Sequence, residues 1–248
     1  MNNLRLGIVM IDEPFYSKSF ISELLENFEI KFVLLHTEFI SIERILKTFL
    51  IYSPIKFFKT VFGVFKNTIK GGEIKNILTN NQVPILKTDN VNSEEVSKFI
   101  KYKEIDILIS FNCPQKIKKE LLDKPEIYPI NIHLGYLPQY RGIFPIFHAF
   151  KNGENFAGIT IHIMNEEFDD GDIINQIKIS IEKKDDLLSL YDKAFSEIPK
   201  LTLQTIHDIN SGNVVFKRNN SEDASYFSYP SFREIISYRK LLKHKKHL

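Results

Sequence analysis

Short apolar runs that alternate with helical segments constrain the fold of this chain more than any other feature. The first run, from Leu4 to Met10, is mostly apolar and ends at the turn residues Asp12, Glu13 and Pro14. Such a run is typical of a buried strand in a parallel sheet. The chain is therefore expected to open with a parallel strand.

The same alternation continues along the chain. The further predicted elements are a helix over 17–26, strands over 30–35 and 83–86, a helix from Asn92 to Lys101, strands over 105–111, 158–164 and 172–181, and a helical stretch over 187–210 that is interrupted near Pro199 and stopped by Gly212. Strands that alternate with helices favour right-handed crossovers and helices on both faces of one sheet. The sequence thus predicts a three-layer, Rossmann-like α/β fold with a mostly parallel sheet.

The pattern changes after Gly212. Two short β-type runs, 214–216 and 225–230, are separated by polar turn residues, and they predict a hairpin folded against the main sheet. A short terminal helix is predicted from Phe232 onward. We therefore divide the chain into a main domain, 1–212, and a small hairpin-and-helix appendage, 213–248.

A helical insertion, 40–72, interrupts the main domain. After Pro54 the apolar residues lie on one face of a predicted helix and lysines on another: Phe58, Val61, Phe62, Phe65 and Ile69 against Lys56, Lys59, Lys66 and Lys70. Two interpretations are open. The helix packs on the body of the protein or on a second subunit, or residues 54–70 make a weak contact with an anionic membrane surface.

Composition narrows the possible partners and compartments. The 248 residues carry a formal net charge of +2, which gives no general attraction to nucleic acid. The single cysteine, Cys113, excludes an intramolecular disulfide, and we expect no metal site. The N-terminus lacks the pattern of a signal peptide, and no uninterrupted apolar stretch is long enough to span a bilayer. We therefore expect a cytoplasmic protein.

Asn131 and His133 end a short apolar run and precede a turn rich in glycine and proline. Side chains alternate along a strand, so these two are expected to point to the same side, at the edge where parallel strands present groups to a ligand. An amide that donates to an oxyanion and an imidazole that carries protons suit acyl transfer. On its own, N-x-H is a common and weak pattern.

The flanking residues make the pattern more specific. The chain reads N-I-H-x-x-x-L-P-x-x-R-G from Asn131 to Gly142, and then T-I-H-x-M-N-E-x-x-D-x-G-D-I-I from Thr160. This combination closely resembles the folate-dependent formyltransferase family, which includes methionyl-tRNA formyltransferase, glycinamide ribonucleotide transformylase and the nucleotide-sugar N-formyltransferases. The resemblance extends from about Val83 to about Tyr229.

The resemblance implies a catalytic trio of Asn131, His133 and Asp169, with 1–212 as the catalytic domain. It also implies N10-formyltetrahydrofolate as the formyl donor and a homodimer. The folate pocket would be formed largely by backbone, at the positions Phe111, Asn112, Cys113, Pro114 and Phe168. The family often has Ser-Leu where this chain has Gly135-Tyr136, which puts any contact made by that serine in doubt.

The acceptor amine remains open between two members of the family. The methionyl-tRNA enzymes carry a further C-terminal barrel, for which the residues after Gly212 are too few. The short aromatic tail and the T-I-H-x-M-N-E motif favour a nucleotide-sugar enzyme. Such an enzyme would act on a dTDP-linked sugar such as dTDP-4-amino-4,6-dideoxyglucose, for the synthesis of O-antigen or other surface glycans. Tyr226, Phe227 and Tyr229 would wall the nucleotide site, or else pack on the core.

His162 is the other histidine of interest, either as a structural residue or as a contact to the acceptor. A function of a different class is also open: the chain could be a non-catalytic module that binds folate or nucleotide. The intact Asn131, His133 and Asp169 argue against such a module.

Overall fold

The computed structural model describes residues 4–11, 16–37, 41–52, 62 and 73–246. The central feature is a seven-stranded sheet in the order β3-β2-β1-β4-β5-β7-β8. Its strands are β1 (Arg5–Ile11), β2 (Glu29–His36), β3 (Ile85–Thr88), β4 (Ile107–Phe111), β5 (Tyr128–His133), β7 (Phe156–Ile163) and β8 (Ile173–Ser180). Strands β1 to β5 run parallel to one another, whereas β7 pairs antiparallel with both β5 and β8.

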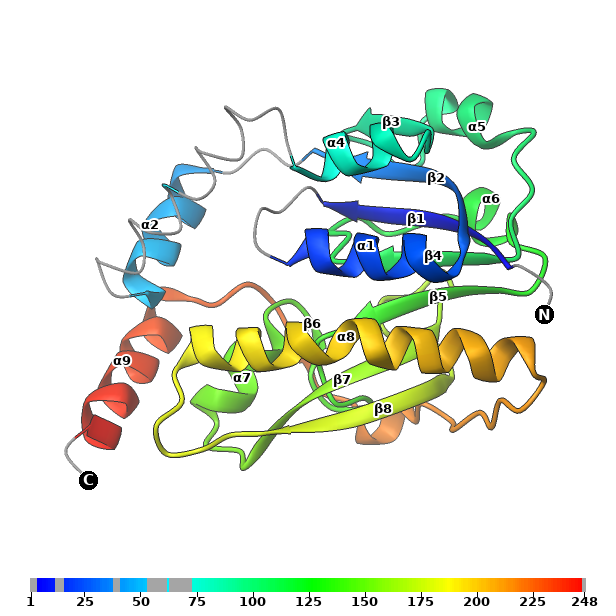
Figure 1. Ribbon diagram of the computed structural model, residues 1–248. Helices are drawn as coiled ribbons and strands as arrows, with labels where there is room; N and C mark the ends of the chain where they lie inside the picture. The colour runs from blue at the N-terminus through cyan, green and yellow to red at the C-terminus, as the bar shows by residue number, and fades with distance from the viewer. Residues whose placement is uncertain (1–3, 12–15, 38–40, 53–61, 63–72, 247–248) are drawn as a thin grey trace.

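Helices cover both faces of this sheet (Figure 1). The helices within the described residues are α1 (Ser17–Asn27), α2 (Ile42–Ile51), α4 (Glu73–Asn80), α5 (Glu94–Ile100), α6 (Lys119–Leu122), α7 (Pro145–Lys151), α8 (Leu187–Asn210) and α9 (Phe232–Lys246). The larger core lies between the sheet and α1, α4, α7 and α8, and the smaller core lies against α5 and α6. The predicted three-layer α/β fold with a mostly parallel sheet is confirmed.

Alternation along β1 explains why two cores form. Ile8 and Met10 point into the larger core, and Val9 between them points into the smaller one. All three side chains are fully buried, so the strand has no polar face. This is why the run was continuous in the sequence rather than alternating.

Pro199 does not interrupt the long helix, contrary to the sequence prediction. Helix α8 is one helix of 24 residues with Pro199 inside it. The proline removes one backbone hydrogen bond, but its neighbours Ile198 and Leu201 are buried against the sheet. Packing of that face holds the helix together across the proline. The predicted stop is correct: Gly212 has φ +66°, and Asn213 N donates to Asp208 O at 2.9 Å.

The predicted hairpin of the appendage does not form among the described residues. Strand β9 (Tyr226–Phe227) pairs in parallel with β6 (Arg141–Gly142), and Lys217 forms an isolated bridge with Ile173 of β8. A 3-10 turn, Ser221–Asp223, lies between them. The appendage therefore joins the main domain at two places, and its terminal helix, α9, is confirmed. The division at residue 212 stays a proposal.

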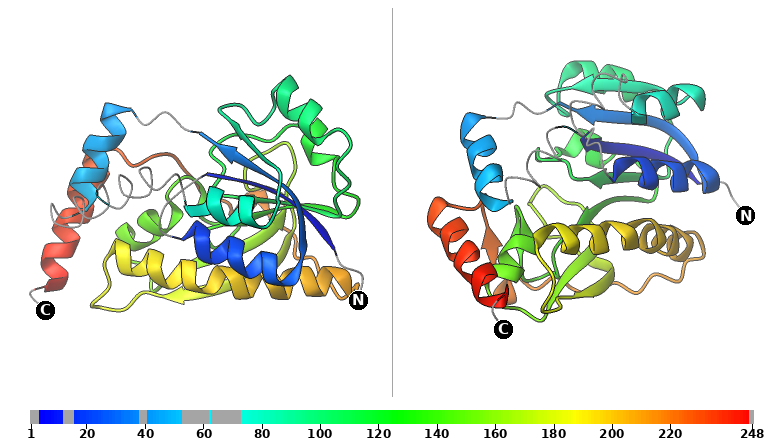
Figure 2. Two further views of the ribbon diagram at one scale, coloured as in Figure 1. Left: turned by 45° about the horizontal axis from the view of Figure 1, so that its top comes forward. Right: turned by 60° about the vertical axis from the view of Figure 1, so that its left-hand side comes forward.

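Helices α2 and α9 lie together at one end of the molecule, beyond α7 (Figure 2). Of the predicted insertion, 40–72, the structure describes 41–52 and Phe62. The amphipathic helix predicted after Pro54 otherwise falls outside the described residues. No helix within the described ranges is long and apolar enough to cross a membrane.

Candidate active site

Asn131, His133 and Asp169 meet at a single carboxylate oxygen. Asn131 Nδ2 lies 3.3 Å from Asp169 Oδ1, and His133 Nδ1 lies 3.4 Å from the same atom. Asn131 and His133 reach it from the carboxyl end of β5, on the same side of the strand, and Asp169 comes from the loop between β7 and β8. Two segments that are well separated in the sequence thus form one cluster.

His133 is buried, and its ring has a defined tautomer. Its Nε2 lies 2.7 Å from the carbonyl oxygen of Tyr140. A carbonyl can only accept a hydrogen bond, so Nε2 carries the proton and donates it. In the neutral ring Nδ1 is then unprotonated, and it faces Asp169 at a distance longer than a good hydrogen bond. Nδ1 is therefore the nitrogen that can accept a proton.

Asp169 is held by the backbone of β6. Gly142 N donates to Asp169 Oδ2 at 2.8 Å, while the amides on either side donate elsewhere, Arg141 N to Ser225 O just before β9 and Ile143 N to Phe227 O in β9. This alternation along β6 turns the Gly142 N–H toward the carboxylate. Asp169 itself has φ +52°, an uncommon conformation for a residue other than glycine. The position of the Asp169 carboxylate is thus set by the backbone conformation of Asp169 and by the hydrogen bond from Gly142 N.

His162 pairs with Asn131 across β5 and β7 and is buried. Its Nδ1 donates to the carbonyl of Ile163 at 2.7 Å, so its Nε2 accepts a hydrogen bond from Asn131 Nδ2 at 3.1 Å. Both protons of the Asn131 amide are then directed at His162 and Asp169. His162 touches the predicted catalytic amide, which neither of its sequence interpretations specified.

Burial and charge set the protonation of the pair. Burial lowers the pKa of His133 below its ordinary 6.5, although the Asp169 charge and the Tyr140 carbonyl oppose that shift. Burial alone would raise the pKa of Asp169, but attraction to the protonated form of His133, together with His162 and the Gly142 N–H, holds it well below its usual range. Near neutral pH, Asp169 is therefore ionised and His133 is neutral.

Arg141 and Asn219 tie the Asp169 loop to the appendage. Both are buried, and Arg141 Nη2 donates to Asn219 Oδ1 at 3.0 Å while Nη1 pairs with Asp170. Asn219 Nδ2 donates to the carbonyls of Asp169, at 2.8 Å, and Gly171, at 3.2 Å. Through these contacts Arg141 anchors the loop that carries Asp169.

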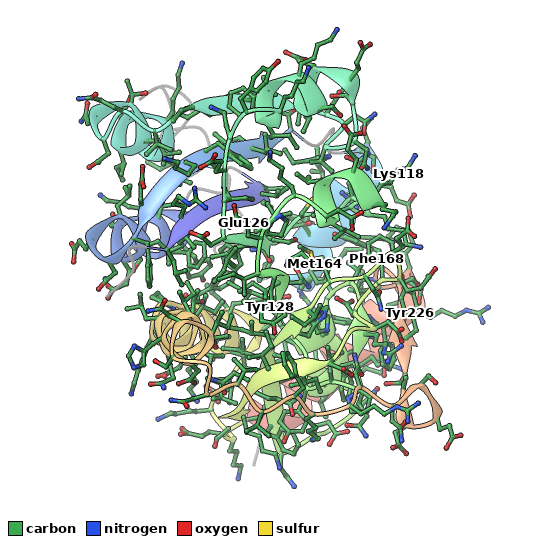
Figure 3. All side chains as sticks on the ribbon, turned by 90° about the vertical axis from the view of Figure 1, so that its right-hand side faces the viewer. Lys118, Glu126, Tyr128, Met164, Phe168 and Tyr226 are labelled. Atoms are coloured by element: carbon green, nitrogen blue, oxygen red, sulfur yellow. The ribbon has the colours of Figure 1, made fainter. Side chains whose placement is uncertain are left out.

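The residues predicted to form the folate pocket lie beside this cluster. Strand β4 pairs with β5, placing Phe111 opposite Ile132, so Asn112 and Cys113 follow at the same edge as His133. Asn112 has φ +55°. Phe168, 42% exposed, packs near Lys116, whose Nζ lies 3.0 Å from Glu167 Oε2. Figure 3 labels Phe168 near the middle height of the face that it draws.

The predicted aromatic wall is divided among three environments. Tyr226 is 60% exposed, Phe227 stacks between His148 and Tyr140, and Tyr229 contacts Phe144. Only Tyr226 presents a largely free ring (Figure 3). Two hollows lie nearby, one of about 300 Å³ lined in part by Gly135 and Tyr140 and one of about 590 Å³ lined in part by Asp170 and Asn219, and neither is lined by Tyr226, Phe227 or Tyr229.

Several contributors were missed in the sequence. The Tyr140 carbonyl and the Gly142 N–H are backbone groups, and Asn219 lies 50 residues from the loop it holds. No pattern in the sequence marked Asn219. Within the ranges that the structure describes, His, Cys, Asp and Glu side chains form no group of three able to hold a metal ion.

Comparison with protein families adds an independent result. A family model described as Formyl transferase matches residues 59–206. The methionyl-tRNA formyltransferase of Halothermothrix orenii is 34% identical over 151 residues, which are 61% of this chain and 48% of that protein. The chain spans about half the length of the curated relatives it matches.

Solved structures share the fold. Phosphoribosylglycinamide formyltransferase from Bacillus halodurans aligns with a TM-score of 0.63 at 21% identity, covering 84% of this chain and 95% of that chain. An N-formyltransferase from Helicobacter canadensis, solved with folinic acid and dTDP-3-aminofucose, aligns with a TM-score of 0.64 at 18% identity, covering 98% of this chain and 82% of that chain. At these identities the likeness concerns the fold.

Proposed function

The chain belongs to the formyl transferase family, and from that premise we propose that it moves a formyl group from N10-formyltetrahydrofolate to the amino group of a nucleotide-linked amino sugar. The observation that carries the proposal is the meeting of Asn131 Nδ2 and His133 Nδ1 at Asp169 Oδ1. Formyl transfer needs a donor for a developing oxyanion and a proton carrier side by side. These side chains supply both.

The strand edge beside the cluster fits the folate donor. The backbone of Phe111, Asn112, Cys113 and Pro114 would hold the pterin from one side and the loop with Phe168 from the other. Lys116 joins the two walls through Glu167 and the Phe168 ring. When bound, N10-formyltetrahydrofolate supplies the formyl carbon and, at N10, the nitrogen that leaves.

Each residue of the trio then has one task. His133 Nδ1 accepts the proton released as the acceptor amine forms its bond to the formyl carbon, and returns a proton to the leaving nitrogen as the old bond breaks. Asp169 stabilises the imidazolium that exists between the two steps. Asn131 donates to the formyl oxygen and gives up one of its two present hydrogen bonds to do so. The bond to Asp169 is longer than the bond to His162.

Two observations support an amino sugar as the acceptor. A structural neighbour was solved with dTDP-3-aminofucose, and its alignment covers 98% of this chain. In this chain Tyr226 offers an exposed ring on which a nucleotide base can stack. We propose a dTDP-linked sugar, dTDP-4-amino-4,6-dideoxyglucose in particular, used in O-antigen or other surface glycan synthesis. A cytoplasmic homodimer belongs to the same proposal, as does weak membrane-surface contact through residues 54–70.

A second candidate is formylation of methionyl-tRNA. It is favoured by the curated relatives, which are methionyl-tRNA formyltransferases of 31% to 34% identity. A non-catalytic module that binds folate or nucleotide is the third. Formylation of methionyl-tRNA would leave the roles of the trio unchanged, whereas a non-catalytic module would give the trio no role in turnover.

A steady-state assay separates the three. The purified chain is given N10-formyltetrahydrofolate with dTDP-4-amino-4,6-dideoxyglucose, its 3-amino isomer, a UDP-linked amino sugar or methionyl-tRNA. We expect turnover with a dTDP-amino sugar, abolished in His133→Ala. Turnover only with methionyl-tRNA would establish the second candidate, and folate binding without turnover of any acceptor would establish the third. A thermal-shift screen of free nucleotides identifies the base.

A further inference from the structure

The peptide that holds His133 is itself held by the appendage. Tyr140 N donates to Ser225 Oγ at 2.9 Å, and Arg141 N donates to Ser225 O at 2.9 Å. Ser225 therefore accepts from two successive amides. The carbonyl between those amides, that of Tyr140, points to His133 Nε2 at 2.7 Å.

Tyr140 needs this support because its backbone is strained. It has φ +61°, which costs free energy for a residue with a side chain. The Ser225 hydroxyl satisfies its amide, and its ring stacks on Phe227 at 5.3 Å. Without the hydroxyl, the Tyr140 amide would lose its partner and the peptide could relax toward ordinary backbone angles, carrying the carbonyl away from His133.

Gly135 leaves the space that this arrangement requires. A Cβ at position 135 would lie 2.5 Å from His133 Nε2 and 2.7 Å from Tyr140 O, too close to both atoms of the hydrogen bond. The chain has glycine here where the family often has serine. Gly135, which has no side chain, therefore leaves room for the hydrogen bond between His133 and Tyr140.

We propose that Ser225 is a positioning residue: it fixes the Tyr140 carbonyl, which holds His133 in the Nε2–H tautomer and leaves Nδ1 free to accept a proton. The role of Nδ1 as base rests on the proposed function. The tautomer itself does not. Ser225 acts only through Tyr140 and touches none of the three predicted catalytic side chains.

Nitrogen NMR of the full chain tests the tautomer without any substrate. Ring ¹⁵N shifts of His133 are assigned by comparison with His133→Gln, since the chain has seven histidines. We expect the Nε2–H tautomer in the wild type and a mixture in Ser225→Ala and in Gly135→Ala. Ser225→Thr, which restores the hydroxyl, should return the wild-type shifts. Ser225→Cys, a weaker acceptor of similar size, takes the place of the alanine variant if that variant does not fold.

Ser228→Ala is the matched control, because Ser228 is exposed and contacts His148 through its backbone carbonyl, which alanine keeps. It should leave the His133 shifts unchanged. A wild-type Nδ1–H tautomer, or wild-type shifts in both Ser225→Ala and Gly135→Ala, would overturn the proposal.

Kinetics give the second readout. The Tyr140 carbonyl favours the protonated ring, as does Asp169, whereas His162 and Arg141 oppose it. Loss of the carbonyl in Ser225→Ala should therefore move the acidic limb of kcat/KM to lower pH and reduce kcat about tenfold, the effect of about one hydrogen bond. A fall in kcat with an unmoved limb would show a merely structural role. Correct tautomers with no turnover of any acceptor would reject the proposed function and leave the positioning of His133 intact.

Discussion

Among single residues, Asp169 carries the charge on which the proposed mechanism depends most directly. Its Oδ1 faces His133 and Asn131, and its Oδ2 accepts from Gly142 N. Asparagine would keep the shape and remove the charge that stabilises the imidazolium. We expect Asp169→Asn to lower kcat by roughly 10⁴-fold, as loss of the carboxylate does in other triads.

Asp172→Asn is the matched control, since Asp172 lies in the same loop but is exposed. It should retain nearly full turnover with the same acceptor. Circular dichroism of both variants checks that the fold is retained. Near-normal turnover in Asp169→Asn would remove Asp169 from the mechanism.

The pH dependence of the reaction follows from His133. As a base His133 must be neutral. Burial lowers its pKa below 6.5, so it becomes protonated, and loses its activity as a base, at a lower pH than an ordinary histidine. The acidic limb of kcat/KM should have its midpoint below pH 6.5. His207→Gln, at an exposed position, should not move the limb. A midpoint above 6.5 would contradict the assignment.

The trio could be found in the sequence because its side chains do the chemistry. Asn131, His133 and Asp169 are the residue types that the reaction needs, at the family's spacing. The groups that orient them could not be found in this way. The Tyr140 carbonyl and the Gly142 N–H exist at every ordinary position of a chain, and only the folded geometry shows which ones face the site.

Among the elements, the pairing of β6 with β9 has the largest consequence for the site. The sequence predicted strand-forming residues at 214–216 and 225–230 but paired them with each other, because local pattern gives strand propensity and not the partner. The five parallel strands were easier to predict, since their continuous apolar runs leave few alternatives. The choice of β6 as partner depends on contacts across more than 80 residues of sequence.

Gly142→Ala tests that pairing. Gly142 has φ +94°, and a Cβ there would lie 2.1 Å from Phe227 O, so alanine must separate the two strands. Gly153 has a similar φ, +77°, but nothing lies within 4 Å of its Cβ position. Both variants carry the strain of a positive φ. We therefore expect Gly142→Ala to lose about 2 kcal/mol more in urea unfolding than Gly153→Ala.

The same substitution should also affect catalysis. Displacing β6 moves the Gly142 N–H from Asp169 Oδ2, so kcat should fall in Gly142→Ala and stay near the wild-type value in Gly153→Ala. Equal unfolding free energies for the two variants would show that the contact with Phe227 O is not a constraint on this part of the fold.

For the whole molecule, Glu234 links the appendage to the main domain. It accepts from Ser231 and pairs with Lys151 of α7 at 3.0 Å. Burial would raise the pKa of Glu234, but the Ser231 hydrogen bonds and Lys151 together lower it from 4.5 to about 2. A depressed pKa contributes stability above the unfolded value, and that contribution is lost as the pH falls from 4.5 toward 2.

Glu234→Gln should therefore lower the thermal midpoint above pH 4.5, and the difference from wild type should shrink as the solution becomes more acidic. Differential scanning calorimetry across this range measures it. Glu222→Gln, at an exposed position, is the control and should show no such trend. A constant difference at every pH would mean that the ionised carboxylate contributes nothing to holding α9.

The hydrogen bonds from the appendage to the active site have a consequence for the synthesis of the protein. Ser225 is hydrogen-bonded to Tyr140, 85 residues away in the sequence, and Asn219 is hydrogen-bonded to Asp169, 50 residues away. A nascent polypeptide that has emerged from the ribosome only as far as α8 already contains all three members of the trio, but lacks what aligns them. Since contacts between distant residues close late, we expect the sheet to assemble before residues 219–227 are synthesised, and catalytic competence to require those residues.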